Sequence, residues 1–63
     1  MNKRDRVRVV KILIDPPDKK YDVYLGKIGT IVGMWIDRKK MIVRLDGDDH
    51  NHGFSPNELE VIE

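Results

Sequence analysis

The side chains best suited to chemistry in this sequence are cations that alternate with aromatic rings. Lysine and arginine bind phosphate through charge, and aromatic rings stack on unpaired bases. We expect outward-facing cations at Arg6, Arg8, Lys27, Arg38, Lys39, Lys40 and Arg44, and stacking surfaces at Tyr21, Tyr24 and Trp35. This set predicts a nucleic-acid-binding face that favours single-stranded or structured RNA over reading of duplex sequence.

Trp35 has two interpretations. The only tryptophan of a small domain commonly belongs to its core. Strict alternation along the segment 26–36 gives Trp35 the same face as Ile31 and Gly33, which favours the core. On the other interpretation, the indole ring is exposed and stacks on a base. Both interpretations remain open at the level of the sequence.

A run of aspartate and histidine between Asp46 and His52 is the second candidate for chemistry. His50 and His52 are two residues apart, so on a strand both would face one side, and imidazoles with carboxylates bind divalent metals. However, a tight turn favours Asp-Gly in any case, and the run lacks the calcium-loop pattern. We predict no metal site and no cofactor. No serine or threonine has an evident base beside it, so we expect no catalytic residue and no small-molecule substrate.

Composition sets limits on the class of protein. The chain has 63 residues, which indicates a single domain over residues 1–63 with a thin core. It contains no cysteine, which removes disulfides and fits a cytoplasmic location. No apolar run approaches the ~20 residues of a membrane helix. The net charge of +1 argues against coating of nucleic acid by bulk charge, so any binding must rely on local charge.

The elements that must position these residues are short strands. Residues 6–14 are dense in β-branched side chains, and the two prolines at positions 16 and 17 end that strand. We predict strands over residues 6–14, 26–36, 41–45, 50–54 and 59–63, a loop over 15–25, tight turns over 37–40 and 46–49, and a helical turn over 55–58. No stretch has a helical period over ten residues, so the fold class is all-β. Small domains of this kind close into barrels to remove their edges.

The glycines at positions 26, 29 and 33 weaken what is otherwise a strand. A phosphate-binding loop would need a helix directly after the glycines, whereas a strand follows here. In a small barrel, glycine permits a sharp bend and close approach between strands. We therefore interpret Gly26 and Gly29 as corner and close-approach residues.

The loop over residues 15–25 supports a second function. Its apolar and aromatic side chains exceed what a solvated loop needs, and they are Tyr21, Val23, Tyr24 and Leu25. These residues either fold back over one mouth of the barrel or bind another protein. The alternative function is therefore an accessory subunit that docks onto a larger complex.

The order of strands and the segments GKIGTIV, DRKK and MIVRLDG resemble the SH3-like barrel with a KOW motif, found in ribosomal proteins and transcription elongation factors. The resemblance covers Arg6 to Gly47 as motif and most of the chain as fold. It implies a non-catalytic, five-stranded module that binds RNA.

Two further resemblances use the same fold. DRVRV at residues 5–9 and the segment 54–62 are similar to small SH3-like accessory subunits, such as the variable chain of ferredoxin–thioredoxin reductase, which implies docking without chemistry. DRVR and GTIVG also resemble strands of the plasmid-encoded dihydrofolate reductase. That enzyme works through a Val-Gln-Ile-Tyr stretch, and HNHGFSP stands there in this chain, so no catalytic residue is carried over.

Overall fold

The computed structural model describes residues 1–13 and 18–63. Its strands are β1 (Arg6–Val9), β2 (Ile28–Trp35), β3 (Lys40–Leu45), β4 (Asn51–Phe54) and β5 (Leu59–Val61). The remaining elements are 3-10 helices: η1 (Lys19–Tyr24), η2 (Ile36–Arg38) and η3 (Pro56–Glu58). The all-β prediction and the approximate positions of five strands are confirmed. No helix among the described residues has the length and apolar character needed to cross a bilayer.

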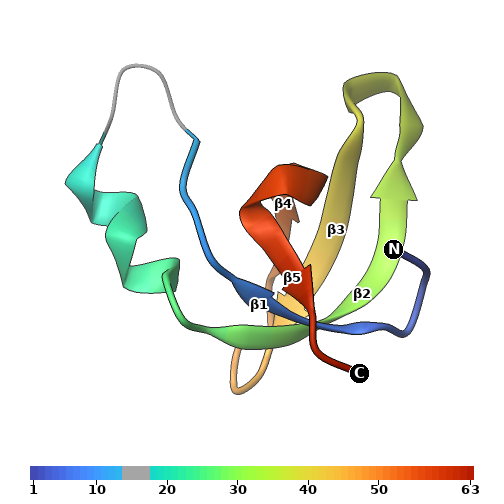
Figure 1. Cartoon of the computed structure of the whole chain (residues 1–63), viewed down its shortest axis with the longest axis horizontal. Coiled ribbons are helices and arrows are strands. Elements are labelled where there is room, and N and C mark those ends of the chain that lie inside the picture. Colours follow the sequence, from blue (N-terminus) through green and yellow to red (C-terminus); the bar gives the residue numbers. More distant parts are fainter. Residues whose placement is uncertain (14–17) are drawn as a thin grey trace.

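All five strands belong to one antiparallel sheet in the order β4-β3-β2-β1-β5 (Figure 1). The long strands β2 and β3 form a hairpin that rises at the upper right of Figure 1. The first strand pairs with the last, and β4 and β5 remain as edge strands. The predicted closure into a barrel is therefore not shown, because no ladder joins β4 to β5.

The core lies on one face of this curved sheet. Alternate residues of each strand contribute to it, as the period of two requires. The buried apolar side chains are Val7, Val9, Ile31, Met41, Val43, Leu45, Phe54 and Leu59, with Ile12 and Tyr24 packed against them. Complete burial of a valine or isoleucine contributes about 1.5–3 kcal/mol, so these side chains are the main source of stability.

β1 is shorter than the sequence predicts. The strand ends at Val9, and the apolar residues Val10 and Leu13 are exposed. The backbone N–H of Val10 donates to the carbonyl oxygen of Glu58 at 2.8 Å, and the N–H of Leu13 donates to the Glu58 carboxylate at 2.8 Å. After β1 the backbone therefore donates hydrogen bonds to Glu58 of η3 and no longer to a neighbouring strand. The hydrophobicity of residues 10–13 alone does not predict this change.

The structure explains why Gly29, one of the glycines in the predicted second strand, must be glycine. A Cβ atom at this position would lie 2.5 Å from the carbonyl oxygen of Arg44 and 2.9 Å from the Cα of Leu45. Only glycine allows β2 and β3 to approach this closely, which confirms the close-approach interpretation. Gly47 is glycine for a different reason, because its φ of +82° in the β3–β4 turn lies in the left-handed region that favours glycine.

The segment after β4 forms the predicted helical turn. Ser55 is its N-cap and Pro56 its first residue, a combination that suits proline because that N–H has no helical partner. The Glu58 side chain turns back and accepts a hydrogen bond from the N–H of Ser55 at 2.7 Å. Glu58 is 4% exposed and is the one buried charged residue among those described. It joins η3 to the chain that follows β1.

Candidate nucleic-acid interface

Residues that pair directly across an antiparallel sheet share a face, so the register defines which side chains point away from the core. We call this side the outer face. The residues of the five strands that belong to the outer face are Arg6, Arg8, Ile28, Thr30, Gly33, Trp35, Lys40, Ile42, Arg44, Asn51, Gly53 and Glu60. The predicted outward orientation of Arg6, Arg8 and Arg44 agrees with this register.

Trp35 also lies on the outer face, so the interpretation of Trp35 as a core residue is wrong. The pairing of β2 with β3 shifts between Ile31 and Gly33, where Val32 is an extra residue without a partner. Such a β-bulge reverses the faces of all later residues in the strand. Ile31 therefore points into the core, whereas Trp35 pairs with Lys40 and is 45% exposed.

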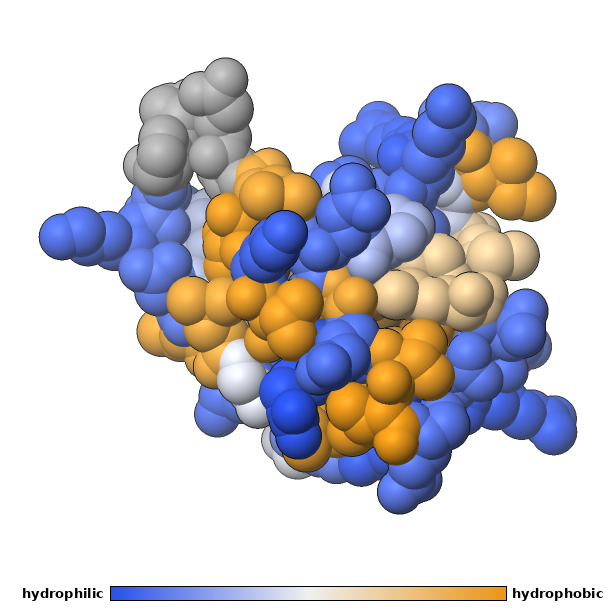
Figure 2. Space-filling view, in the orientation of Figure 1, coloured by the Kyte–Doolittle hydropathy of each residue, from blue (hydrophilic) through white to orange (hydrophobic). Residues whose placement is uncertain are grey.

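The tip of the β2–β3 hairpin combines exposed apolar and cationic side chains. Ile36 is 80% exposed and Met34 is also exposed. The guanidinium carbon of Arg38 lies 4.4 Å from the centre of the Trp35 ring, within the range of a cation–π contact. Lys39 is exposed and has a φ of 52°. Figure 2 shows hydrophobic atoms beside hydrophilic ones at the upper right, where Figure 1 has this tip.

The cations of β1 are partly neutralised. Arg6 donates to both carboxylate oxygens of Asp46 at 2.8 and 2.6 Å, and to the hydroxyl of Thr30 at 2.9 Å. The hydrogen bond from Arg6 lowers the pKa of Asp46 below its ordinary value, and Asp46 in turn raises the pKa of Arg6. Arg8 lies 3.5 Å from Glu60. These two arginines are therefore less available to phosphate than their sequence suggests.

The other predicted cations differ in their surroundings. Arg44 donates from Nε to the side-chain oxygen of Asn51 at 3.0 Å, which leaves its terminal nitrogens free of contacts among the described residues. Lys40 donates to the hydroxyl of Ser55 at 3.2 Å. Lys27 is exposed just before β2, at the opposite end of that strand from Trp35. The structure thus brings Arg38, Lys39 and Lys40 together with Trp35 and separates Lys27 from them.

The predicted first loop contains η1. Residues 15–17 of that prediction lie outside the described residues. Tyr24 packs against the core, with its ring centre 6.0 Å from that of Phe54 and 5.0 Å from that of His52. Val23 is 63% exposed and Leu25 is also exposed. Of the side chains predicted for docking, Tyr24 therefore folds back over the core, and Val23 and Leu25 face solvent.

A pocket of about 350 Å³ lies along the free edge of β4. Tyr21, Tyr24 and Phe54 give it aromatic walls, and Ile12 and Leu13 line the side opposite β4. The outer-face residues Lys40, Asn51 and Gly53 also line the pocket, and Glu58 contributes a buried carboxylate. Sequence reasoning did not predict this pocket, because it brings together four separate parts of the chain.

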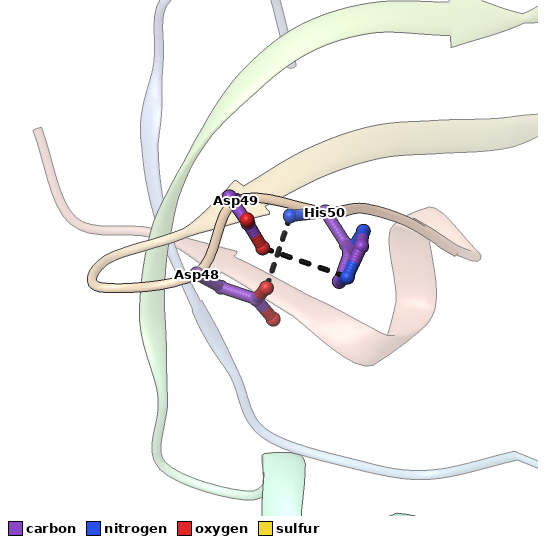
Figure 3. A group of neighbouring side chains, drawn as sticks. All are labelled: Asp48, Asp49 and His50. Carbon is purple, nitrogen blue, oxygen red and sulfur yellow. Dashed lines mark hydrogen bonds and ion pairs between the residues drawn. The ribbon is translucent and has the colours of Figure 1, made fainter.

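Aspartate and histidine side chains lie close together after β3, and Figure 3 shows three of them, Asp48, Asp49 and His50. The His50 ring lies 3.5 Å from Asp49, and the His50 backbone N–H donates to Asp48 at 3.0 Å. The His52 ring lies 2.8 Å from the other oxygen of Asp48. The two histidines therefore do not share a face as predicted, because His50 precedes β4. The ligand atoms of Asp48, Asp49 and His50 lie within 4.8 Å of one another, and exposed acidic groups of this kind are common without a bound ion.

Comparisons of this chain with protein-family models, with curated proteins and with solved structures find no match. The arrangement of its own residues is therefore the basis for assigning a function.

Proposed function

We propose that this protein is a non-catalytic module that binds single-stranded RNA through the tip of the β2–β3 hairpin and the outer face beside it. The observation that supports this function is the exposed Trp35 ring next to Arg38 and Lys39. An exposed aromatic ring flanked by cations is the usual platform for an unpaired base and its phosphates.

The local charge favours this surface over the rest of the chain. Arg38, Lys39 and Lys40 follow one another, and Asp37 is the one acidic residue of the turn. At the other end of the outer face, Asp46 and Glu60 offset the arginines of β1. Phosphate binding depends on the nearby charge, so the hairpin tip is the stronger site although the net charge is only +1.

Arg38 prepares the Trp35 ring for a base. Its guanidinium lies 4.4 Å from the ring centre, so it holds the indole in one orientation before any ligand arrives. A base stacks on the free side of the ring, or replaces the guanidinium, which then turns to a phosphate. Both arrangements use one aromatic plane and one cation, and neither reads a particular base.

We extend the proposal to the fold family and the location. The strand order, the close approach at Gly29 and the basic hairpin turn support an SH3-like barrel with a KOW-like motif. The absence of cysteine supports a cytoplasmic setting.

The direct test is fluorescence anisotropy with a labelled single-stranded RNA of about ten nucleotides. The double variant Arg38→Glu/Lys39→Glu should lose binding, and Lys3→Glu/Lys11→Glu is the control because it changes the same charge at exposed positions elsewhere. The slope of log affinity against log salt should be about −0.7 for each phosphate contacted. Absence of binding by the native protein at low salt, or equal losses in both variants, would refute the proposal.

A second function, docking onto a larger protein complex, is supported by the exposure of Val23 and Leu25 beside the packed Tyr24. Two exposed aliphatic side chains on a loop held by an anchored ring form a small adhesive surface. Binding through them should depend weakly on salt. Val23→Ser/Leu25→Ser should abolish a protein contact and leave RNA affinity unchanged.

A further inference from the structure

Two glycines on the outer face, Gly33 and Gly53, are not required by crowding within the chain, although Gly33 follows the bulge at Val32, where glycine is common. A Cβ atom at Gly33 would meet its nearest neighbour, the Cδ1 of Ile42, at 3.8 Å, and one at Gly53 would meet the Cβ of Lys40 at 3.9 Å. Both distances are ordinary contacts, and neither glycine has a positive φ. A glycine in a strand costs about 0.5–1 kcal/mol relative to alanine. Close approach of a ligand from outside is a recognised reason for that cost.

These glycines lie in one row across the sheet. Gly33 pairs with Ile42, and Ile42 pairs with Gly53, so the row crosses β2, β3 and β4 with one side chain in its middle. Trp35 and Lys40 form the next row on one side, and Thr30, Arg44 and Asn51 form the next row on the other. We call the low row between them the glycine trough.

The dimensions and ends of the trough suit an extended polymer. Its two flanking rows are four residues apart on β3, about 13 Å at 3.3 Å per residue. One end lies beside the exposed Trp35 ring. At the other end, Gly53 is exposed on the edge strand β4 and lines the 350 Å³ pocket. The trough therefore connects an aromatic ring at the hairpin to the aromatic walls of the pocket.

The charges along the trough select a polyanion. Lys40 lies in one of the two rows that flank the trough and Arg44 in the other, and Arg38 lies at the Trp35 end. At the pocket end, Lys20 lies 5.1 Å from the centre of the Tyr21 ring and 3.7 Å from the Asp18 carboxylate, which offsets part of its charge. The acidic groups of the outer face, Asp46 and Glu60, are paired with the arginines of β1 and lie outside the trough.

We propose that single-stranded RNA lies along the glycine trough, with its backbone over Gly33 and Gly53, one base against Trp35 and another base in the pocket beside Tyr21. This inference rests on the proposed RNA-binding function and specifies its path. The backbone crosses the sheet along the row in which Ile42 is the one side chain, and the lysine and arginine side chains of the two flanking rows face its phosphates. The pocket provides apolar and aromatic surfaces for a base that is no longer stacked on its neighbours.

The test fills the trough without adding charge. The series is Gly53→Ala and Gly53→Val, together with Gly33→Ala. A Cβ atom at either position meets its nearest neighbour at 3.8 Å or more, so the thermal stability of the two alanine variants should stay equal or rise. Gly53→Val adds a β-branched side chain at an exposed position of an edge strand, and its melting temperature is measured beside them. RNA affinity, measured by anisotropy with a ten-nucleotide single-stranded RNA, should fall progressively with side-chain size at position 53. For Gly53→Val the expected loss is about tenfold, comparable to the loss of one stacked base.

The outcomes separate the path from the function. If Arg38→Glu/Lys39→Glu abolishes binding while folded Gly53→Val and Gly33→Ala bind as the native protein does, the trough is wrong and the function survives. If the native protein does not bind RNA, the function itself is wrong. Photo-crosslinking of 4-thiouridine RNA gives an independent measurement: adducts on both Trp35 and Tyr21 support the path, and adducts confined to the hairpin tip overturn it.

Discussion

Replacement of Gly29 by alanine is the most demanding test of the sheet geometry. The added Cβ would lie 2.5 Å from the Arg44 carbonyl oxygen and 2.9 Å from the Leu45 Cα. Both are backbone atoms, so no rotamer change removes the conflict, and β2 must move away from β3. The same movement disturbs β1, because Gly29 also pairs with Val7.

The expected cost follows from these contacts. Overpacking of a core costs about 1–3 kcal/mol, and a clash with backbone on a central strand belongs at the upper end, about 2–3 kcal/mol. A chain of 63 residues has a total unfolding free energy of about 3–9 kcal/mol at 0.05–0.15 kcal/mol per residue. At about 4–8 °C per kcal/mol, the melting temperature should fall by roughly 10–20 °C.

Urea denaturation followed by far-UV circular dichroism measures this loss, and Gly53→Ala is the matched control. The control adds the same methyl group to a strand of the same sheet, but its nearest neighbour is 3.9 Å away. Its unfolding free energy should stay constant or increase by about 0.4–1 kcal/mol. A Gly29→Ala variant as stable as Gly53→Ala would refute the argument that strand approach requires glycine at position 29.

Three further predictions concern single side chains. Lys39→Gly should raise the melting temperature, because φ = 52° strains lysine by about 1 kcal/mol, and should weaken RNA binding, because the proposed site loses an ammonium group. A lower melting temperature, or unchanged RNA affinity, would contradict this prediction. Glu58→Ala should lose about 2–3 kcal/mol of unfolding free energy in urea, since two backbone N–H groups lose their buried acceptor, whereas Glu60→Ala on the exposed surface should lose less than about 1 kcal/mol. The hydrogen bond with the His52 ring is the largest of the interactions that lower the pKa of Asp48. The ionised carboxylate therefore stabilises the fold above pH ~4, and this stabilisation is lost as the pH falls through the lowered pKa. Asp48→Asn should flatten the acid side of the stability–pH profile, and an unchanged profile would show that Asp48 does not cause the loss of stability in acid.

The sequence predicts the strands where one local rule decides the structure. Alternation places Val7 and Val9 in the core, and the Asp-Gly pair at position 46 marks the β3–β4 turn. Proline after serine marks η3. In each case neighbouring residues contain the whole physical cause, so no knowledge of distant contacts is needed.

The sequence does not predict features that depend on distant partners. The end of β1 is set by Glu58, which lies far along the chain and accepts the N–H of Leu13. The Arg6–Asp46 ion pair likewise joins β1 to the turn after β3, and it offsets the charge of an arginine that the sequence predicts to bind RNA. The position of Trp35 on the outer face depends on the bulge at Val32, whereas strict alternation would place Trp35 on the core face.

The bulge at Val32 also determines where the gene for this protein tolerates a change in length. Loss of one residue elsewhere between Ile28 and Ile31 would invert the side chains on one side of the gap, exchanging core for solvent. Loss of Val32 removes a residue that has no partner on β3, so Gly33 still pairs with Ile42 and Trp35 still pairs with Lys40. A single-codon deletion at this position therefore keeps both the core and the hairpin surface in register.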